Sequence, residues 1–130
     1  MTVPADLVDD AAELADVIKR PVDLIELGQQ IFVVLREVPL PAGAYKVERS
    51  DALFIADRQY RCSALDMFWT EIQVVRADGT VPDNAEQIEQ YVERSWRRFS
   101  WHRNGVWNPS RNGLIDHYEF MQDRFAKDVA

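Results

Sequence analysis

The sequence predicts an α+β fold in which one helix precedes an antiparallel meander of strands and helices follow it. Three runs of β-branched and aromatic residues, 31–35, 51–57 and 67–75, are bounded by polar, proline- or glycine-containing segments, as is typical of strands. Apolar residues recur at helical spacing near both ends of the chain. We therefore expect one antiparallel sheet with the C-terminal helix packed on its face.

The first element is predicted to be a helix over residues 6–19. Asp6 is placed to cap its N-terminus, and Pro21 ends it because proline lacks the N–H that a helix needs. The apolar positions of its buried face are Leu7, Ala11, Leu14 and Ile18. This spacing predicts an amphipathic helix that packs on a core.

The strands are predicted from short apolar runs. The runs 31–35 and 51–57 favour an antiparallel pair, because the prolines and the glycine between them supply a turn or an irregular connection. A third strand at 45–48 is compatible with this pattern. The run 67–75 predicts the next strand, which an Asp-Gly turn signal at 78–79 would close.

Two helices are predicted after the strands. Asn84 and Gln87 resemble a capping box, which favours a helix through residue 95. Its face would consist of Ile88, Tyr91, Val92 and Ser95. The last helix is expected to begin near Ser110 or Asn112. Its apolar stripe would consist of Leu114, Tyr118, Met121 and Phe125.

The composition is typical of one globular domain. Among 130 residues, 47% are hydrophobic and 28% are charged, so we expect a single domain over residues 1–130. Cys62 is the only cysteine, which excludes an internal disulfide and a cysteine-based metal cluster. His102 and His117 lack the spacing of a metal motif. We therefore expect neither a metal nor a cofactor.

The beginning of the chain leads to an expectation about location. Its first ten residues are acidic and contain no apolar core, unlike a signal peptide. No apolar run approaches the ~20 residues that span a bilayer. We therefore expect a cytoplasmic protein without a membrane segment.

The positive charge of the second half is concentrated in residues 94–112, here called the basic segment. It contains five arginines, one histidine and no acid, although the whole chain has a net charge of −7. The overall acidity argues against a nucleic-acid binder, because such proteins present a basic face to phosphates. We expect the segment to dock an acidic protein partner through a set of four residues. These are Arg97, Arg98, Trp101 and Arg103.

Five motifs occur in an order that resembles a known family. They are LPAGAY (40–45), ALDMFW (64–69), GTVP (79–82), SWRRFSWH (95–102) and VWNPSRNGL (106–114). Across about residues 37–125 the chain is similar to the prokaryotic ubiquitin-conjugating-enzyme-like proteins called family E. The resemblance implies a ubiquitin-conjugating-enzyme-like fold, with a meander, an extended active-site segment and C-terminal helices.

The resemblance also implies partners and a setting. The expected partners are a ubiquitin-like modifier protein and its activating enzyme, with no nucleic acid and no membrane involved. For such families, a setting beside activating and deubiquitinating-type proteins, in antiphage defence or mobile-element modules, is also implied.

The resemblance places a serine where conjugating enzymes carry their nucleophilic cysteine. Two motifs are absent, because Tyr60 is followed by Arg61 instead of proline and no His-Pro-Asn lies within 69–96. Residues 107–109, Trp-Asn-Pro, match the Trp-Ser-Pro-like turn that follows the cysteine. Counting back from this turn leads to Ser100. The resemblance therefore implies that Ser100 receives the modifier as an oxyester.

A serine nucleophile needs a base within hydrogen-bond reach. His102 is two residues away, which places both side chains on one face of an extended segment. Arg97, Arg98 or Arg103 could then stabilise an oxyanion. The alternative is that Ser100 is a small loop residue and His102 binds a backbone group. The protein would then be a non-catalytic adaptor with the same fold.

Several other residues have competing interpretations. Cys62 is the rival nucleophile, but a lone cysteine is more often a small buried hydrophobe. The interleaved arginines and aromatics of residues 96–103 also fit a stacking platform for single-stranded nucleic acid. His117, beside Asp116, is expected to make a structural hydrogen bond. The aromatics expected in the core are Trp69, Trp96 and Phe99.

Overall fold

The computed structural model describes residues 3–103 and 105–128. Within them, one helix precedes and one follows a six-stranded sheet whose strand order is β1-β2-β3-β4-β6-β5. The elements are α1 (Ala5–Ile18), β1 (Val22–Leu27), β2 (Gln30–Pro39), β3 (Arg49–Asp57), β4 (Phe68–Thr70), β5 (Ile88–Tyr91), β6 (Arg94–Phe99) and α2 (Leu114–Asp128). All neighbouring strands are antiparallel, so the predicted α+β class is confirmed.

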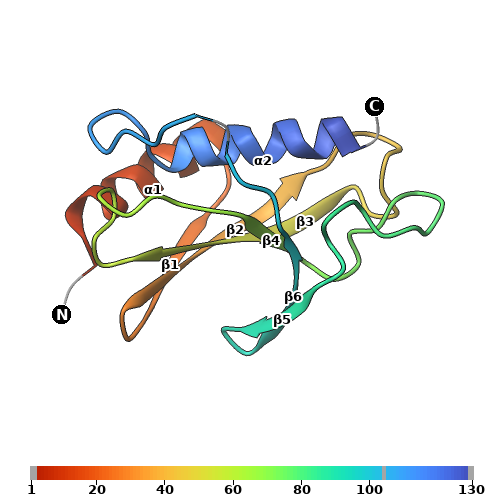
Figure 1. The fold of residues 1–130 in the computed structure, drawn as a ribbon, viewed down its shortest axis with the longest axis horizontal. Coiled ribbons are helices and arrows are strands. Elements are labelled where there is room, and N and C mark those ends of the chain that lie inside the picture. Colours follow the sequence, from red (N-terminus) through yellow and green to blue (C-terminus); the bar gives the residue numbers. More distant parts are fainter. Residues whose placement is uncertain (1–2, 104, 129–130) are drawn as a thin grey trace.

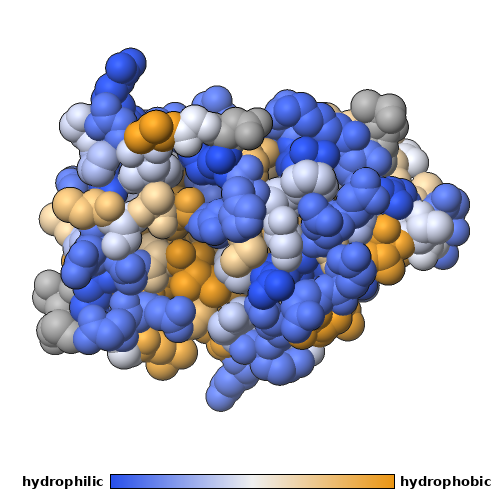
Figure 2. All heavy atoms as spheres, in the orientation of Figure 1, coloured by the Kyte–Doolittle hydropathy of each residue, from blue (hydrophilic) through white to orange (hydrophobic). Residues whose placement is uncertain are grey.

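Both helices lie on the same side of the sheet, and the β5–β6 hairpin projects from the opposite side (Figure 1). The resemblance implied several C-terminal helices, but among the described residues only α2 follows the sheet. The hydrophilic side chains that cover most of the face in Figure 2 leave the apolar residues in small separate areas. A partner that binds this face therefore meets mainly polar and charged groups.

Helix α1 follows the predicted apolar spacing but begins differently from the prediction. It starts at Ala5 after Pro4, and no side chain caps it. The prediction that Asp6 is the N-cap is therefore wrong, because Asp6 lies inside the first turn, where its charge favours the positive end of the helix dipole. The helix ends at Ile18, and Lys19 then adopts a left-handed conformation with φ of 57°.

The strands β2 and β3 pair as predicted, but other strand boundaries differ. Residues 22–27 form the edge strand β1, which was not predicted. Of the predicted strand 67–75 only β4 is regular, because the chain leaves the sheet after Thr70. Residues 45–48 contain no strand, and Tyr45 makes a single bridge to Arg76.

The predicted helix through residue 95 is wrong, because this region forms the hairpin β5–β6. Val92 and Glu93 connect the strands as a two-residue turn, and their φ values of 45° and 63° are both positive. Hairpin turns of type I′ require this conformation at both positions. The sequence Val-Glu carries none of the asparagine or glycine that normally indicates such a turn.

The sheet buries apolar side chains on both faces. The face toward the helices carries Ile31, Val33, Leu35, Ala52 and Phe54. The opposite face carries Phe32, Val34, Leu53, Trp69 and Trp96. The β5–β6 hairpin covers this second face, since the Tyr91 ring lies 5.5 Å from that of Phe32 and 5.9 Å from that of Trp69. The core positions predicted for Trp69, Trp96 and Phe99 are confirmed.

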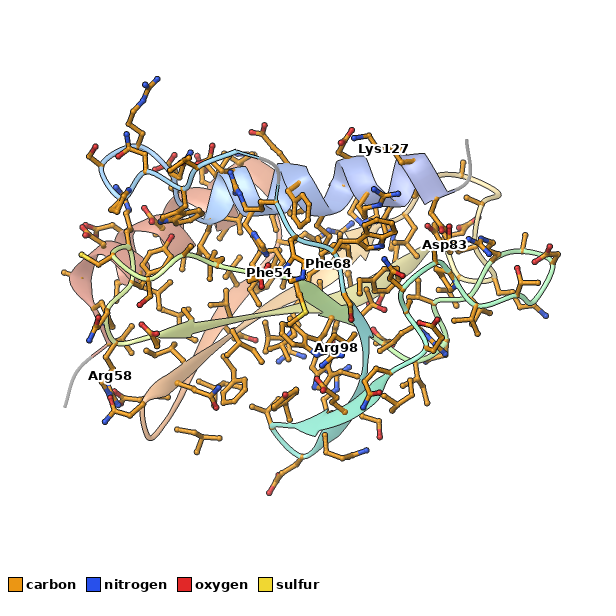
Figure 3. All side chains as sticks on the ribbon, in the orientation of Figure 1. Phe54, Arg58, Phe68, Asp83, Arg98 and Lys127 are labelled. Carbon is orange, nitrogen blue, oxygen red and sulfur yellow. The ribbon has the colours of Figure 1, made fainter. Side chains whose placement is uncertain are left out.

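Helix α2 packs on the sheet with a stripe that differs at one position from the prediction. Leu114, Met121 and Phe125 are buried as expected, but His117 takes the buried place predicted for Tyr118. Phe54 and Phe68 lie between the sheet and this helix (Figure 3). The helix is therefore held against the same sheet face as α1.

Candidate functional site

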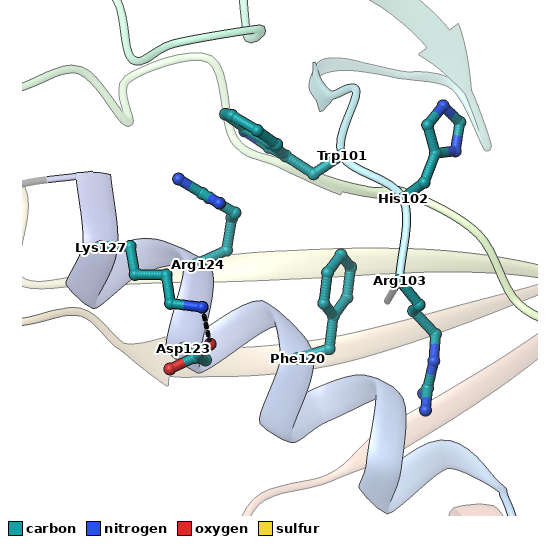
Figure 4. A pocket seen from close by; sticks show the side chains of 7 residues that line it. All are labelled: Trp101, His102, Arg103, Phe120, Asp123, Arg124 and Lys127. Carbon is teal, nitrogen blue, oxygen red and sulfur yellow. Dashed lines mark ion pairs between the residues drawn. The ribbon is translucent and has the colours of Figure 1, made fainter. Parts of the chain in front are cut away.

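The predicted site lies on the segment that leaves β6 and returns to α2. Ser100 directly follows β6, and its backbone N–H donates to the carbonyl of Asn84 over 2.9 Å. This bond holds the start of the segment against the chain that enters β5. The next three residues have no regular structure, and their side chains point in three directions (Figure 4).

Ser100 is partly exposed, and its hydroxyl is bonded to an arginine. The Nε–H of Arg98 donates to Ser100 Oγ over 2.9 Å, and Nη1 of the same guanidinium donates to Glu89 over 2.9 Å. A guanidinium at this position stabilises negative charge on the hydroxyl oxygen, but it cannot accept the hydroxyl proton. The base must therefore come from another side chain.

His102 carries an exposed imidazole that is paired with a carboxylate. Its Nδ1 lies 2.8 Å from Asp66 Oδ1, and its side chain is 72% exposed. An acceptor at Nδ1 favours the tautomer that keeps the proton there, which leaves Nε2 as a proton acceptor. Among the described residues no hydrogen bond joins His102 to Ser100, so the two predicted catalytic residues share a segment without direct contact.

Two of the four residues expected to dock a partner are already engaged. Arg97 is only 8% exposed, and it donates to the carbonyl oxygens of Ala85 and Ile72 over 2.7 and 3.0 Å. Burial also lowers the pKa of Arg97. The expectation that Arg97 lies on an exposed basic face is therefore wrong. Arg98 is partly exposed, and its ion pair with Glu89 offsets its charge.

Trp101 and Arg103 remain accessible beside α2. The Trp101 Nε1–H donates to the carbonyl of Asp83 over 3.1 Å, and the Arg124 guanidinium lies 3.6 Å from the centre of its ring. Because this cation covers one face of the ring, Trp101 is a poor platform for stacked bases. The Arg103 guanidinium lies 5.0 Å from the centre of the Trp107 ring.

Cys62 is exposed and lies closer to the basic segment than the sequence suggested. The Trp107 Nε1–H donates to the carbonyl of Arg61 over 2.8 Å, so the loop that carries Cys62 lies against this segment. The expectation of a buried cysteine is wrong. The separation along the chain concealed this contact, and Cys62 has to be tested beside Ser100 in any search for an adduct.

His117 has the structural hydrogen bond that the sequence predicted. Its Nε2–H donates to the carbonyl of Met67 over 2.6 Å, and the residue is 0% exposed. Burial is the main reason that its pKa falls to about 4. Asp116 accepts the N–H of Gly113 over 2.8 Å at the start of α2. Both residues therefore help to position the helix.

Comparison with known proteins adds one match. A sequence model of the family described as Prokaryotic E2 family E matches residues 9–128. No curated protein and no solved structure matches the chain. In the described part of the chain, no helix has the length and apolar character of a membrane span, and no group of three or more His, Cys, Asp or Glu side chains could hold a metal.

Proposed function

The chain belongs to prokaryotic E2 family E, and on this basis we propose that it accepts a ubiquitin-like modifier from an activating enzyme and transfers it. Family membership supports a ubiquitin-like conjugating function in general. The helix, antiparallel sheet and helix in this order support a ubiquitin-conjugating-enzyme-like fold. We expect this activity in the cytoplasm, and a role in antiphage defence remains an expectation from the resemblance.

The acceptor in this proposal is Ser100. Its Oγ attacks the carbonyl carbon of the modifier, which the activating enzyme holds as a thioester. The new C–O bond replaces the C–S bond, the hydroxyl proton passes to Nε2 of His102, and the departing thiolate takes up that proton. The product is an oxyester on Ser100 that an amine can then attack.

The exposed pair of His102 and Asp66 is the observation that carries this proposal. The carboxylate holds the proton on Nδ1, so Nε2 is left to act as the base. To reach Ser100 the imidazole has to turn toward it when the substrate binds, and its 72% exposure allows this rotation. Arg98, which already donates to Oγ, would stabilise the negative charge that develops there.

A second candidate function is that of a non-catalytic adaptor. The observation that favours it is the bond from Arg98 to Ser100, because this bond occupies the hydroxyl while no base touches it among the described residues. An adaptor would bind the modifier or the activating enzyme through the same surface without forming a covalent bond.

The chemistry of the adduct distinguishes these functions. The protein is incubated with the activating enzyme, the modifier and ATP, and the product is treated with thiol reductant or with hydroxylamine. An oxyester survives the reductant and is cleaved by hydroxylamine, whereas the adduct of Ser100→Cys should be cleaved by both. A modifier that binds the wild type without any adduct would favour the adaptor.

The base is tested in the same reaction. His102→Gln should slow adduct formation by roughly two to four orders of magnitude, because general base catalysis contributes about this much. Asp66→Asn should slow it less, since it changes only the orientation and tautomer of the imidazole. Arg111→Gln removes a charge from the basic segment without touching the pair and serves as the matched control. Equal rates for His102→Gln and Arg111→Gln would contradict the assignment.

A further inference from the structure

A pocket of about 310 Å³ lies between the basic segment, which contributes Trp101, His102 and Arg103, and helix α2. The helix lines this pocket with Phe120, Arg124 and Lys127, which are three or four residues apart and therefore lie on one helix face. Figure 4 shows Phe120 between the two arginines. The Phe120 ring packs edge-on against Phe68 at 5.9 Å, so the pocket has a fixed aromatic floor.

The two arginines of this pocket have no anionic partner. Among the described residues, neither Arg103 nor Arg124 bonds to a carboxylate or a carbonyl oxygen, and Nη1 of Arg103 and Nε of Arg124 are buried without any hydrogen bond. Lys127 differs, because its Nζ lies 2.8 Å from Asp123. The chain contains more acidic than basic residues, yet these two arginines pair with none of the described carboxylates. Both guanidinium groups are therefore available to an anionic ligand.

Aromatic rings hold both guanidinium groups in place without neutralising them. Arg124 lies 3.6 Å from the ring centre of Trp101, and Arg103 lies 5.0 Å from that of Trp107. The Trp101 ring is itself fixed by its bond to the Asp83 carbonyl. A cation–π contact leaves the outer nitrogens of a guanidinium free to donate. The positions of both cations are therefore set before a ligand arrives, which lowers the entropy lost on binding.

We propose that this pocket binds a carboxylate group of a peptide chain. A guanidinium presents paired N–H groups that match the two oxygens of a carboxylate, and both arginines are among the residues that line this pocket. The Phe120 ring offers an apolar surface to the side chain next to the carboxylate. Ser100 does not line the pocket, and His102 lines it without being needed to bind a carboxylate, so the inference goes beyond the transfer function.

The same features argue against a nucleotide. A stacked base needs an open ring face, but Arg124 already covers one face of Trp101 and the Nε1–H of this ring is engaged. A polyphosphate carries several negative charges, which the net charge of −7 and the nearby Asp123 disfavour more than a single carboxylate. The two cations of the pocket and the negative charge around them therefore favour a ligand with a single carboxylate, such as an otherwise neutral peptide.

The probe is acetyl-Gly-Gly-Leu with a free C-terminal carboxylate, titrated into the full chain. Binding is followed by calorimetry and by the NMR signal of the Trp101 indole N–H. The same peptide as a C-terminal amide should bind about tenfold more weakly or worse, because it lacks the charge-assisted bonds. Acetyl-Gly-Glu-Leu amide carries the carboxylate on a side chain. Comparison of the two acids shows whether the pocket prefers a chain terminus or an acidic residue.

Variants test whether these two arginines are responsible. Arg124→Gln and Arg103→Gln should each weaken binding of the preferred acid about tenfold, while Arg111→Gln, an equal charge change outside the pocket, should leave it unchanged. Thermal unfolding confirms that each variant is folded. Equal binding of the acid and the amide, an equal loss in Arg111→Gln, or displacement of the peptide by inorganic phosphate at lower concentration than by acetate would overturn the proposal.

Discussion

Replacing His117 by leucine should remove a pH dependence from the stability of the protein. His117 is 0% exposed, its Nε2–H is bonded to Met67, and its Nδ1 is buried with no hydrogen-bond partner. The ring lies edge-on to Phe54 at 4.6 Å and is shielded from solvent, so a second proton there would be poorly solvated. The loss of solvation is the main cause that lowers the pKa of His117 to about 4, from an ordinary value of 6.5.

The direction of the effect follows from proton binding. Because the folded pKa lies below the unfolded one, the unfolded chain binds the extra proton first as the pH falls. Stability from this residue is complete above pH 6.5 and decreases as the pH approaches 4. The full difference between the two pKa values corresponds to about 3.5 kcal/mol of unfolding free energy, at roughly 1.4 kcal/mol for each pH unit, and most of it is lost by pH 4.

Urea unfolding at a series of pH values from about 7.5 to 4 measures this loss. The wild type should lose about 3 kcal/mol more than His117→Leu over that interval. All other titratable groups are common to both proteins, so their contributions cancel in the difference. Parallel curves for the wild type and His117→Leu would refute the reasoning.

Three further substitutions test how the fold is held together, each by urea unfolding. Gly113→Ala should cost about 1–3 kcal/mol, because the new Cβ would lie 2.7 Å from Oδ2 of Asp10, whose carboxylate is fixed by its partners. Arg97→Met should cost about 2–3 kcal/mol through lost bonds to the carbonyls of Ala85 and Ile72, whereas exposed Arg111→Met should change stability by less than about 0.5 kcal/mol. Met121→Asp should unfold the protein, since it buries a charge without a partner; a folded variant would contradict the assigned core.

The sequence predicts the parts of the fold that carry their own local pattern. The run 31–35 is apolar throughout because both sheet faces are buried, and the run 51–57 pairs with it. The sequence predicts a helix in place of the hairpin β5–β6, because Ile88, Tyr91 and other apolar residues also fit a helical face. The strands are favoured because Tyr91 contacts aromatic residues of strands that are distant in the sequence. A local sequence pattern contains no information about such contacts.

The site was only partly predictable for a similar reason. Ser100 and His102 could be singled out from the motifs, but their partners could not. Asp66 lies 36 positions from His102 along the chain, and nothing in its local sequence indicates that contact. The cationic face of α2 could have been predicted from the sequence, because Phe120, Arg124 and Lys127 follow helical spacing. The apolar stripe on the other side of the helix is the stronger pattern and masks this one.

Intact-mass spectrometry after incubation with activating enzyme, modifier and ATP is the most direct test of the transfer function. The wild type and Cys62→Ala should each gain the mass of one modifier minus one water, and Ser100→Ala should gain none. Both variants are compared at equal concentration after their folding has been verified. An adduct that persists in Ser100→Ala and disappears in Cys62→Ala would contradict the account and assign the modifier to the exposed thiol of Cys62.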